Sequence, residues 1–308
     1  MVAPATEATP VREAASVRSL SAVFRRDWPL RAWLPVTVAA LAFVLLFANP
    51  SVSLFHDWLT DDDAGQGLLL FPVALWLAWR AGIRIGTAPA IRSGTLILAA
   101  AVFIRILGSL ASEFFSQRFA IWLAIVGLVV FCFGWRQVRH WWLPLTLLFL
   151  SIPLPALITN ELAIPLQFRA SRLGTALIKW RHIPVRVAGN VIQIPNATLF
   201  VAEACSGLRS LSALFGLGVL IGGMYLRSIP GRVLLLLLVI PVAVVLNAVR
   251  IFLTAFLVYF VDDSLAQGAA HQRQGLAMFI VAFAVMGVIA FGVAAGERLV
   301  ARRMAKHA

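Results

Sequence analysis

The chain has 308 residues, of which 61% are hydrophobic and 13% are charged, and its mean hydropathy is +0.92. Soluble domains have about 45–50% apolar and about 25% charged residues, so this composition excludes a soluble protein and indicates an integral membrane protein. The formal net charge is +13, but Lys and Arg fall mostly in short connections between apolar runs. The sequence therefore predicts contact with a lipid bilayer and no nucleic-acid binding.

Eight apolar runs follow an N-terminal stretch that has no long hydrophobic segment. They cover residues 33–49, 67–81, 95–112, 117–134, 138–152, 207–226, 231–260 and 275–296. Most are near the length of about 20 residues that crosses a bilayer. The predicted fold is all-α, a polytopic membrane protein of about eight transmembrane helices. The runs 67–81 and 138–152 are short, so each is either extended by its flanks or re-entrant. We expect an N-terminal tail over 1–31, not a signal peptide, a transmembrane domain over 32–297 and a basic tail over 298–308.

Charges in the connections predict the direction of the helices. Basic residues precede the first run, follow the last and occupy alternate connections, whereas acidic residues such as Asp57, Glu113 and Asp262 mark most of the other connections. The segment 153–206 departs from the pattern because it contains Arg169, Arg172, Lys179, Arg181 and Arg186. It is long enough for its charges to have little effect on topology. By the positive-inside rule, both termini are then cytoplasmic. The outward-facing segments are those near 50–66, 113–117, 153–206 and 261–274.

The segment 153–206 has an internal organisation of its own. Pro153 and Pro155 end the fifth helix, because proline has no amide hydrogen and disfavours a helical residue before it. Residues 156–181 have polar groups at roughly helical spacing, which predicts an amphipathic helix on or in the outer face. Alternation after Pro184, with a turn at 189–190, predicts a short β-hairpin.

The stretch Val201–Ser210 combines a thiol, a carboxylate and a guanidinium at the start of the sixth run. The two cysteines of the chain, Cys132 and Cys205, are too few for a disulfide framework or a multi-cysteine zinc site, and we expect no metal or cofactor. A single Cys is more often packed than reactive. A helix N-terminus nevertheless lowers the pKa of a thiol, and Ser206 and Gly207 add a capping hydroxyl and close backbone approach. Cys205 is therefore the candidate nucleophile.

Two further residues fall at the predicted depth of Cys205. Arg250 lies about 19 residues into the seventh run, about 28 Å from its inner start, and His271 lies in the last outer connection. Alone, Arg250 could extend to lipid headgroups and His271 could be an exposed loop residue. Together, a guanidinium held by Asn247 can stabilise an oxyanion, and an imidazole can activate a thiol.

The remaining charged residues near the apolar runs are expected to form ion pairs, because an unpaired charge is costly in a bilayer. Glu203 is expected to pair with Arg209 or Arg250, which leaves Arg209 in a supporting role. Arg105 in the third run is expected to pair with Glu113 or to extend to the headgroups.

The order of these motifs resembles the exosortase/archaeosortase family. The resemblance covers about residues 35–295 and rests on Ala-Glu-Ala-Cys-Ser-Gly-Leu-Arg209, Asn247-x-x-Arg250 and His271, with Pro153-x-Pro155 and the Trp58…Gly67 loop. The chain departs from the family in its first outer loop, where many members have Ser-His-Gly and this chain has Gly65-Gln66-Gly67. We assign that loop no catalytic role.

The resemblance implies a cysteine transpeptidase of the bacterial inner membrane, with its active site on the periplasmic side. Its partners would be secreted proteins with a C-terminal sorting signal, made of a Pro-Glu-Pro-like motif, a transmembrane helix and a basic tail. The implied roles are nucleophile for Cys205, transition-state stabiliser for Arg250 and base for His271, with a thioester intermediate and a link to exopolysaccharide production. Two alternatives remain: a purely hydrolytic membrane protease, and a non-enzymatic polysaccharide-export or transporter subunit, whose polar residues would line a path through the bilayer midplane.

Overall fold

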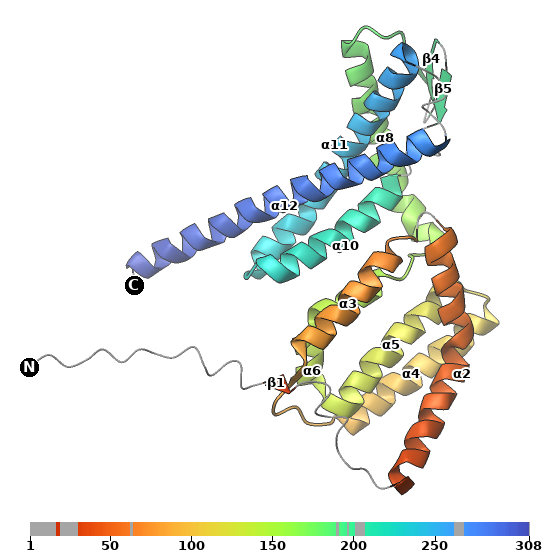
Figure 1. Ribbon diagram of the computed structural model, residues 1–308, viewed down its shortest axis with the longest axis vertical. Coiled ribbons are helices and arrows are strands. Elements are labelled where there is room, and N and C mark those ends of the chain that lie inside the picture. Colours follow the sequence, from red (N-terminus) through yellow and green to blue (C-terminus); the bar gives the residue numbers. More distant parts are fainter. Residues whose placement is uncertain are drawn as a thin grey trace, which may run out of the picture. The chain divides into compact units, whose positions relative to one another are not determined.

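The computed structural model describes residues 17–18, 30–61, 64–188, 191–195, 197–200, 207–261 and 268–307. Its contacts divide the chain into two compact units, Met1–Pro153 (unit 1) and Leu154–Ala308 (unit 2), each of which is mostly helical (Figure 1). The prediction of an all-α polytopic fold is confirmed. We describe each unit separately.

Unit 1 is organised around an antiparallel pair of helices. Its elements are, in chain order, β1 (Val17–Arg18), α2 (Leu30–Thr60), α3 (Gly67–Ala81), β2 (Ile83–Arg84), α4 (Ile91–Leu110), α5 (Phe114–Phe133), α6 (Trp135–His140) and α7 (Trp142–Leu150). Helices α4 and α5 form the pair, and the two-residue strands β1 and β2 pair antiparallel. A Cβ at Gly94 of α4 would lie 2.5 Å from the Cα of Phe131 in α5. Only glycine permits this approach, as is common where helices pack within lipid.

Helix α2 is longer than predicted. It continues to Thr60, although residues 50–60 were expected to form part of a loop. Buried side chains at helical spacing, Phe47, Leu54 and Trp58, continue one face of the helix beyond the end of the apolar run. The polar residues between these side chains interrupt the hydrophobic pattern of the sequence, but the helix continues through them.

The predicted run 138–152 is divided into α6 and α7 at Trp141. Helix α6 is anchored by Gln137, whose side chain is fully buried. Its amide oxygen accepts from the backbone N–H of Arg84 at 3.0 Å, and its amide nitrogen donates to the carbonyl of Gly82 at 3.0 Å. These bonds tie α6 to the α3–β2 connection, which leaves α7 with nine residues.

The described residues of unit 2 form a small sheet and four helices. Its elements are α8 (Ala156–Trp180), β3 (Arg186–Ala188), β4 (Val191–Ile194), β5 (Ala197–Phe200), α10 (Gly207–Tyr225), α11 (Ile229–Phe260) and α12 (Gly268–His307). The antiparallel pair β3–β4 confirms the predicted hairpin, whose turn at 189–190 lies outside the described residues, and β5 adds a third strand. Ile192 and Ile194 of β4 pack with Ile178 of α8 and Ile251 of α11.

Helix α8 confirms the predicted helix over 156–181, but its faces are reversed from those of a soluble amphipathic helix. The face that packs along α11 is made of small and polar residues, whereas large apolar side chains are exposed. A Cβ at Gly174 would lie 2.9 Å from Cγ2 of Ile251. Small residues inside and apolar residues outside are typical of helices that pack within a bilayer. The buried face includes Gln167, Ala170, Ser171, Gly174 and Thr175, and the exposed residues include Ile164, Phe168, Leu173 and Trp180.

Helix α12 begins earlier and ends later than predicted. It starts at Gly268, so residues 268–274 are helical and do not form a connection, and it continues to His307 through the predicted basic tail. Ala, Gln and Arg in these flanks are good helix formers, although they are too polar to extend an apolar run. His271 therefore lies in the first turn of a helix, where a loop position was predicted.

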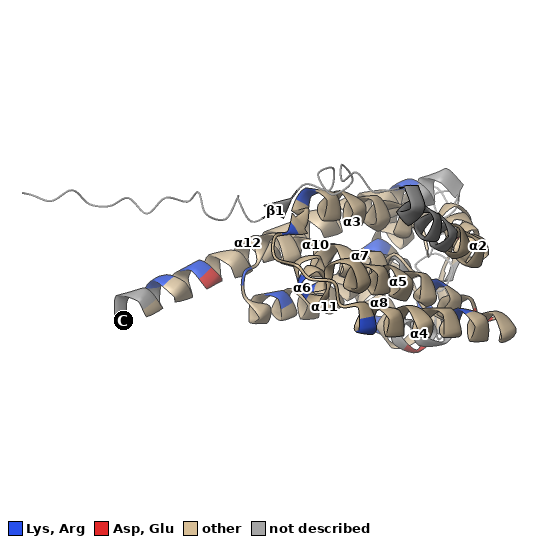
Figure 2. Cartoon of the chain, turned by 90° about the horizontal axis from the view of Figure 1, so that it is seen from below, with Lys and Arg blue, Asp and Glu red and all other residues tan. Residues whose placement is uncertain are grey.

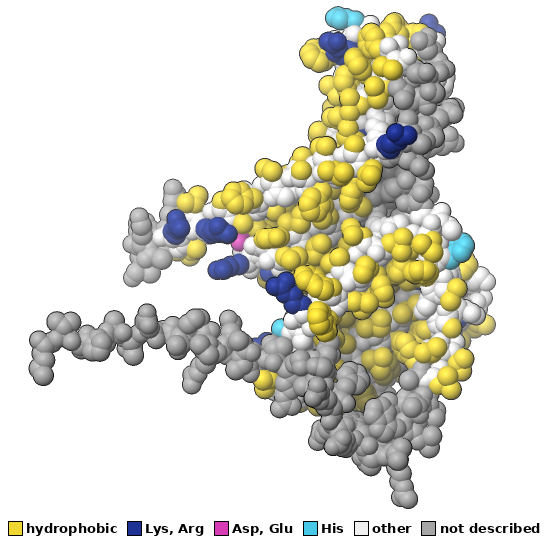
Figure 3. All heavy atoms as spheres, viewed as in Figure 1, with side chains coloured by type: hydrophobic (Ala, Val, Ile, Leu, Met, Phe, Trp, Pro, Cys, Tyr) yellow, Lys and Arg dark blue, Asp and Glu magenta, His cyan; other side chains and the backbone are white. Residues whose placement is uncertain are grey.

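Four helical segments in the described part of the chain are long and apolar enough to cross a membrane. They are Ile91–Leu110, Phe114–Phe133, Ile229–Phe260 and Arg273–Arg302. Hydrophobic side chains cover much of the described surface of both units (Figure 3), and Lys and Arg lie mainly toward helix ends, with few acidic residues (Figure 2). An apolar exterior of this kind is what a bilayer requires.

Candidate functional site

The first candidate site lies where α11 and α12 pack together in unit 2. Asn247, Arg250 and Thr254 follow one another at intervals of about one turn on α11. Asn247 and Thr254 are buried, at 7% and 3% exposure, and Arg250 is half-buried. The Thr254 hydroxyl lies 3.0 Å from the Arg250 carbonyl and 2.9 Å from the amide oxygen of Gln274, and these two acceptors share its one hydrogen. This one hydroxyl links the two helices beside Arg250.

The Arg250 guanidinium rests on the backbone of α12 at Gly275. A Cβ at that position would lie 3.3 Å from Nη2 and 3.7 Å from Cζ of Arg250. That distance is tighter than most Cβ contacts, so glycine gives the planar guanidinium its place against the helix. Arg250 is thereby held on the α12 side of α11.

Residue 271 lies close to this contact along α12. It precedes Gln274 by three residues and Gly275 by four, so it shares their face of the helix. At 1.5 Å per residue, it is about 6 Å from Gly275 along the axis. The His271 side chain lies outside the described residues, and its role stays a prediction.

The packing of α10 along α11 shows which residues of the two helices are level with each other. On α10, Gly218 faces Val239 of α11, and Gly222, four residues later, faces Leu235, four residues earlier. The two helices are therefore antiparallel in a constant register. Extended by 11 residues, this register places Gly207 level with Arg250.

The cysteine motif itself is largely beyond what the structure describes. Glu203, Cys205 and Ser206 lie outside the described residues, and Arg209 is on α10 with its side chain outside them. The predicted pairing of Glu203 with Arg209 or Arg250 thus stays a prediction.

The other end of α12 is anchored as well. Glu297 accepts from the backbone N–H groups of Arg227 and Ser228, and from the Ser228 hydroxyl that also caps α11. Together with the Thr254–Gln274 bond, this contact fixes α12 along α11 at two levels. The level of residue 271 relative to Arg250 is therefore set by polar contacts and not by apolar packing alone.

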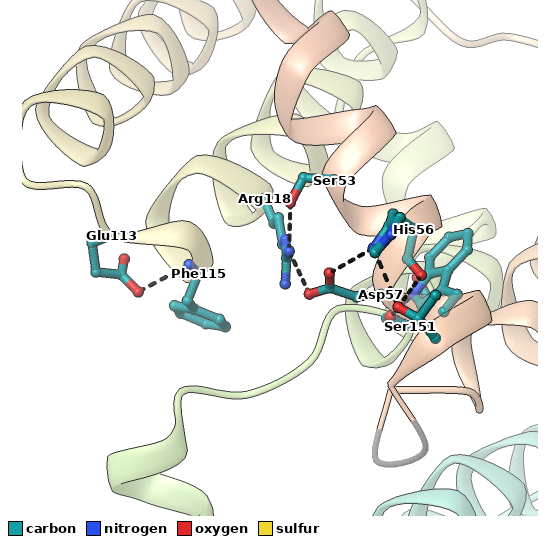
Figure 4. Close-up of polar contacts among 9 residues, drawn as sticks. Ser53, His56, Asp57, Glu113, Phe115, Arg118 and Ser151 are labelled. Carbon is teal, nitrogen blue, oxygen red and sulfur yellow. Dashed lines mark hydrogen bonds and ion pairs between the residues drawn. The ribbon is translucent and has the colours of Figure 1, made fainter.

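A second polar cluster lies in unit 1. Arg118 of α5 is only 6% exposed, and its Nη2 donates to Ser53 at 2.9 Å and to Asp57 at 2.6 Å, both on α2 (Figure 4). An ion pair with so little solvent on the arginine side holds α2 and α5 together. The sequence analysis missed Arg118. The available signal was an arginine at the start of the run 117–134, with an aspartate in the preceding outward-facing segment near 50–66.

The ends of helices in unit 1 are defined by further polar bonds. The Glu113 carboxylate accepts from the backbone N–H groups of Phe115 and Ser116, capping α5. Burial raises the pKa of Glu113, but these hydrogen bonds and the Arg118 charge outweigh it, so the pKa is lowered from its ordinary value. Of the two alternatives expected for Arg105, an ion pair with Glu113 is not formed, and its Nε donates to the Leu46 carbonyl of α2 at 3.1 Å.

The loop before α3 is shaped by Trp58. The Trp58 indole donates to the Ser151 carbonyl at 2.8 Å, and its ring lies against Gly67, where a Cβ would overlap it. The Trp58…Gly67 pattern therefore has a packing role here.

In the described part of the chain, no group of three or more His, Cys, Asp or Glu side chains could hold a metal ion.

The chain was compared with protein-family models, curated proteins and solved structures. No curated protein and no solved structure matches it. A family model described as transmembrane exosortase matches residues 58–288, about three quarters of the chain. That match includes the Cys205 motif, Arg250 and His271, and begins at Trp58. The chain therefore belongs to the transmembrane exosortase family.

Proposed function

We propose that this exosortase-family protein is a membrane-embedded cysteine transpeptidase that cleaves the C-terminal sorting signal of secreted proteins. One observation carries the proposal beyond the family. The start of α10 is level with Arg250, and Arg250 rests on Gly275, one turn from residue 271. Cys205 precedes α10 by two residues along the chain. This order supports a site in which a thiol, a guanidinium and an imidazole meet at one end of unit 2.

The chemistry proceeds through a thioester. His271 takes the Cys205 proton, and the thiolate attacks the carbonyl carbon of the scissile peptide bond. The resulting oxyanion is stabilised by the Arg250 guanidinium. When the tetrahedral adduct collapses, the carbon–nitrogen bond breaks and His271 returns the proton to the leaving amine. An acceptor nucleophile then attacks the thioester, gives its proton to His271 and regenerates the thiol.

Nearby residues support these three. Asn247, buried one turn before Arg250, helps to hold the guanidinium on its side of α11. In this proposal, Glu203 pairs with Arg209 or Arg250 and so orders the motif, while Ser206 and Gly207 supply a capping hydroxyl and close backbone approach next to the thiol. None of these steps requires a metal or a cofactor.

The distribution of charge supports a bacterial inner-membrane enzyme with both termini in the cytoplasm. Arg and Lys at both termini and in alternate short connections support this orientation, which assigns the Cys205 motif to the other side of the membrane. The site then faces the periplasm, where it meets exported substrates that carry a short motif, a membrane-spanning helix and a basic tail. A role beside exopolysaccharide production follows from the family resemblance.

Substitution of the proposed nucleophile tests this function. Cys205→Ala should abolish cleavage of a co-expressed, tagged sorting-signal substrate, while the enzyme remains in the membrane at its normal level. Cys132→Ser is the matched control, because Cys132 is exposed on α5 and has no role in the proposed chemistry. Cleavage by the Cys205→Ala variant would remove the nucleophile and with it the proposal.

The mass of the cleaved product separates transfer from hydrolysis. Transfer adds the mass of an acceptor to the new C-terminus, whereas hydrolysis adds only water. An export or transport subunit would instead tolerate Cys205→Ser and leave the tagged protein uncleaved in the wild type as well.

A further inference from the structure

Unit 1 contains a cavity that the proposed cleavage chemistry does not use. Its volume is about 200 Å³, and side chains of α2, α3, α5 and α7 line it. Apart from Arg118 and two serines, these side chains are hydrophobic. The cavity lies within one unit and is open to the exterior on part of its boundary.

Most of the lining of the cavity, here called the slot, comes from the antiparallel helices α2 and α5. From α5 it is lined by Arg118, Ile121, Trp122 and Ile125, whose spacing of three, four and seven residues defines one helix face. Seven residues correspond to about 10 Å along the axis. The facing residues of α2 have the same spacing and run in the opposite direction: Ser51, Leu54, Phe55 and Trp58.

One end of the slot is polar. Arg118 is 94% buried there, and its Nη2 is used by Ser53 and Asp57. Its Nε is buried, and among the residues that the structure describes it has no hydrogen-bond partner. Because Asp57 already balances the charge, the group that this end lacks is a hydrogen-bond acceptor.

The polar end lies at the level of a membrane boundary. Arg118 is the fifth residue of α5, about 6 Å along the axis from the first residue of a candidate membrane span. Lipid phosphates and glycerol esters lie in this layer, which is several ångströms thick on each side of the hydrocarbon core. The rest of the slot extends from there toward the hydrocarbon core.

We propose that this slot binds one glycerophospholipid. An acyl chain lies along the hydrophobic wall from Ile121 to Ile125, and a phosphate oxygen accepts from Arg118. Phe55, which lines the slot and is 53% exposed, marks the rim through which a chain enters from the bilayer. An extended peptide fits less well, since its N–H and C=O groups would meet an apolar wall that offers few partners.

Native mass spectrometry of the full-length protein, released from detergent micelles, tests the proposal. We expect one phospholipid to remain bound to the wild type. Ile125→Trp fills the deep end of the slot and should remove the bound lipid. Leu128→Trp, on the same helix but at a 41% exposed position outside the slot, should retain it. A wild type without phospholipid, or equal retention by both Trp variants, would overturn the proposal.

The headgroup contact is tested by titration after delipidation. Phosphatidylglycerol should bind the wild type at least about tenfold more tightly than diacylglycerol, which has the chains without the phosphate. The double variant Asp57→Asn/Arg118→Gln leaves no unpaired charge and should lose this preference. Equal binding of both lipids by the wild type would contradict phosphate recognition. If Ile125→Trp retains phospholipid but no longer cleaves the sorting-signal substrate, the slot takes peptide and the lipid proposal is wrong.

Discussion

Arg118 in unit 1 and Arg250 in unit 2 both lie inside candidate membrane spans, but they contact different things. Arg118 is 6% exposed and bonds to the carboxylate of Asp57 on a neighbouring helix. Arg250 is half-buried and rests on the glycine backbone of the helix that carries His271. An arginine tied to a carboxylate secures helix packing, whereas a guanidinium that lies beside the helix carrying a candidate base suits stabilisation of a transient anion.

The largest effect is expected from Arg250→Lys. Lysine keeps the positive charge but loses the planar fork of donors. If Arg250 stabilises the oxyanion, cleavage should fall by about 100-fold or more. The rate of substrate cleavage per membrane-inserted enzyme measures this effect. Near-normal cleavage would give Arg250 the same structural role as Arg118.

Removal of the charge from Arg118 should instead act on stability. Arg118→Leu leaves Asp57 without its partner, and because the Asp57 side chain is 33% exposed, the expected loss is about 2 kcal/mol, less than for a fully buried pair. Thermal unfolding in detergent measures this loss.

The double variant Asp57→Asn/Arg118→Gln is the control for that measurement. It removes both charges and should recover part of the lost stability, since no unpaired charge remains. If the double variant is less stable than Arg118→Leu, the cost comes from lost packing and not from an unpaired carboxylate.

Apolar runs predicted where helices lie, but not where they end. The run 67–81 coincides with α3, whereas α2 and α12 both extend into polar sequence. Hydrophobicity measures which segments tolerate lipid, and a helix can continue beyond them when its flanks have good helix formers or one buried face. The anchoring of α6 was not predictable from its own residues, because the partners of Gln137 lie more than fifty residues away.

The residues around the candidate site were only partly predicted, because contacts between helices cannot be read from the sequence of one helix. Motif order identified Arg250 and His271, but Thr254, Gln274 and Gly275 were missed. Their importance depends on the register between α11 and α12, which no spacing within one helix reveals. The interval of four between His271 and Gly275 could have been read as one shared face.

A smaller loss is expected from Gly275→Ala. The new Cβ would lie 3.3 Å from Arg250 Nη2, so the guanidinium must shift by a few tenths of an ångström. We expect cleavage to fall by about tenfold, because small displacements at a reacting centre are costly. Stability should not fall, since alanine favours a helix over glycine by about 1 kcal/mol.

Gly287→Ala is the matched control on the same helix. A Cβ at Gly287 meets no atom within 4 Å, so the helix gains the same propensity without touching Arg250. Equal activity of the two alanine variants would show that Arg250 does not depend on its contact with Gly275.

The smallest effect on stability is expected from substitution of Glu113, whose carboxylate caps α5 and interacts with the charge of Arg118. The pKa of Glu113 is lowered from 4.5 in the folded protein, because hydrogen bonds to the α5 amides and the Arg118 charge outweigh burial. The ionised carboxylate therefore adds stability above about pH 4.5, and this contribution is lost as the pH falls through the lowered folded-state pKa.

Glu113→Gln keeps an acceptor but removes the charge, so it should cost about 0.5 kcal/mol near neutral pH. In thermal unfolding measured at successively lower pH, the difference from the wild type should narrow below 4.5. A difference that stays constant with pH would assign the cap to hydrogen-bond geometry alone and separate it from the charge of Arg118.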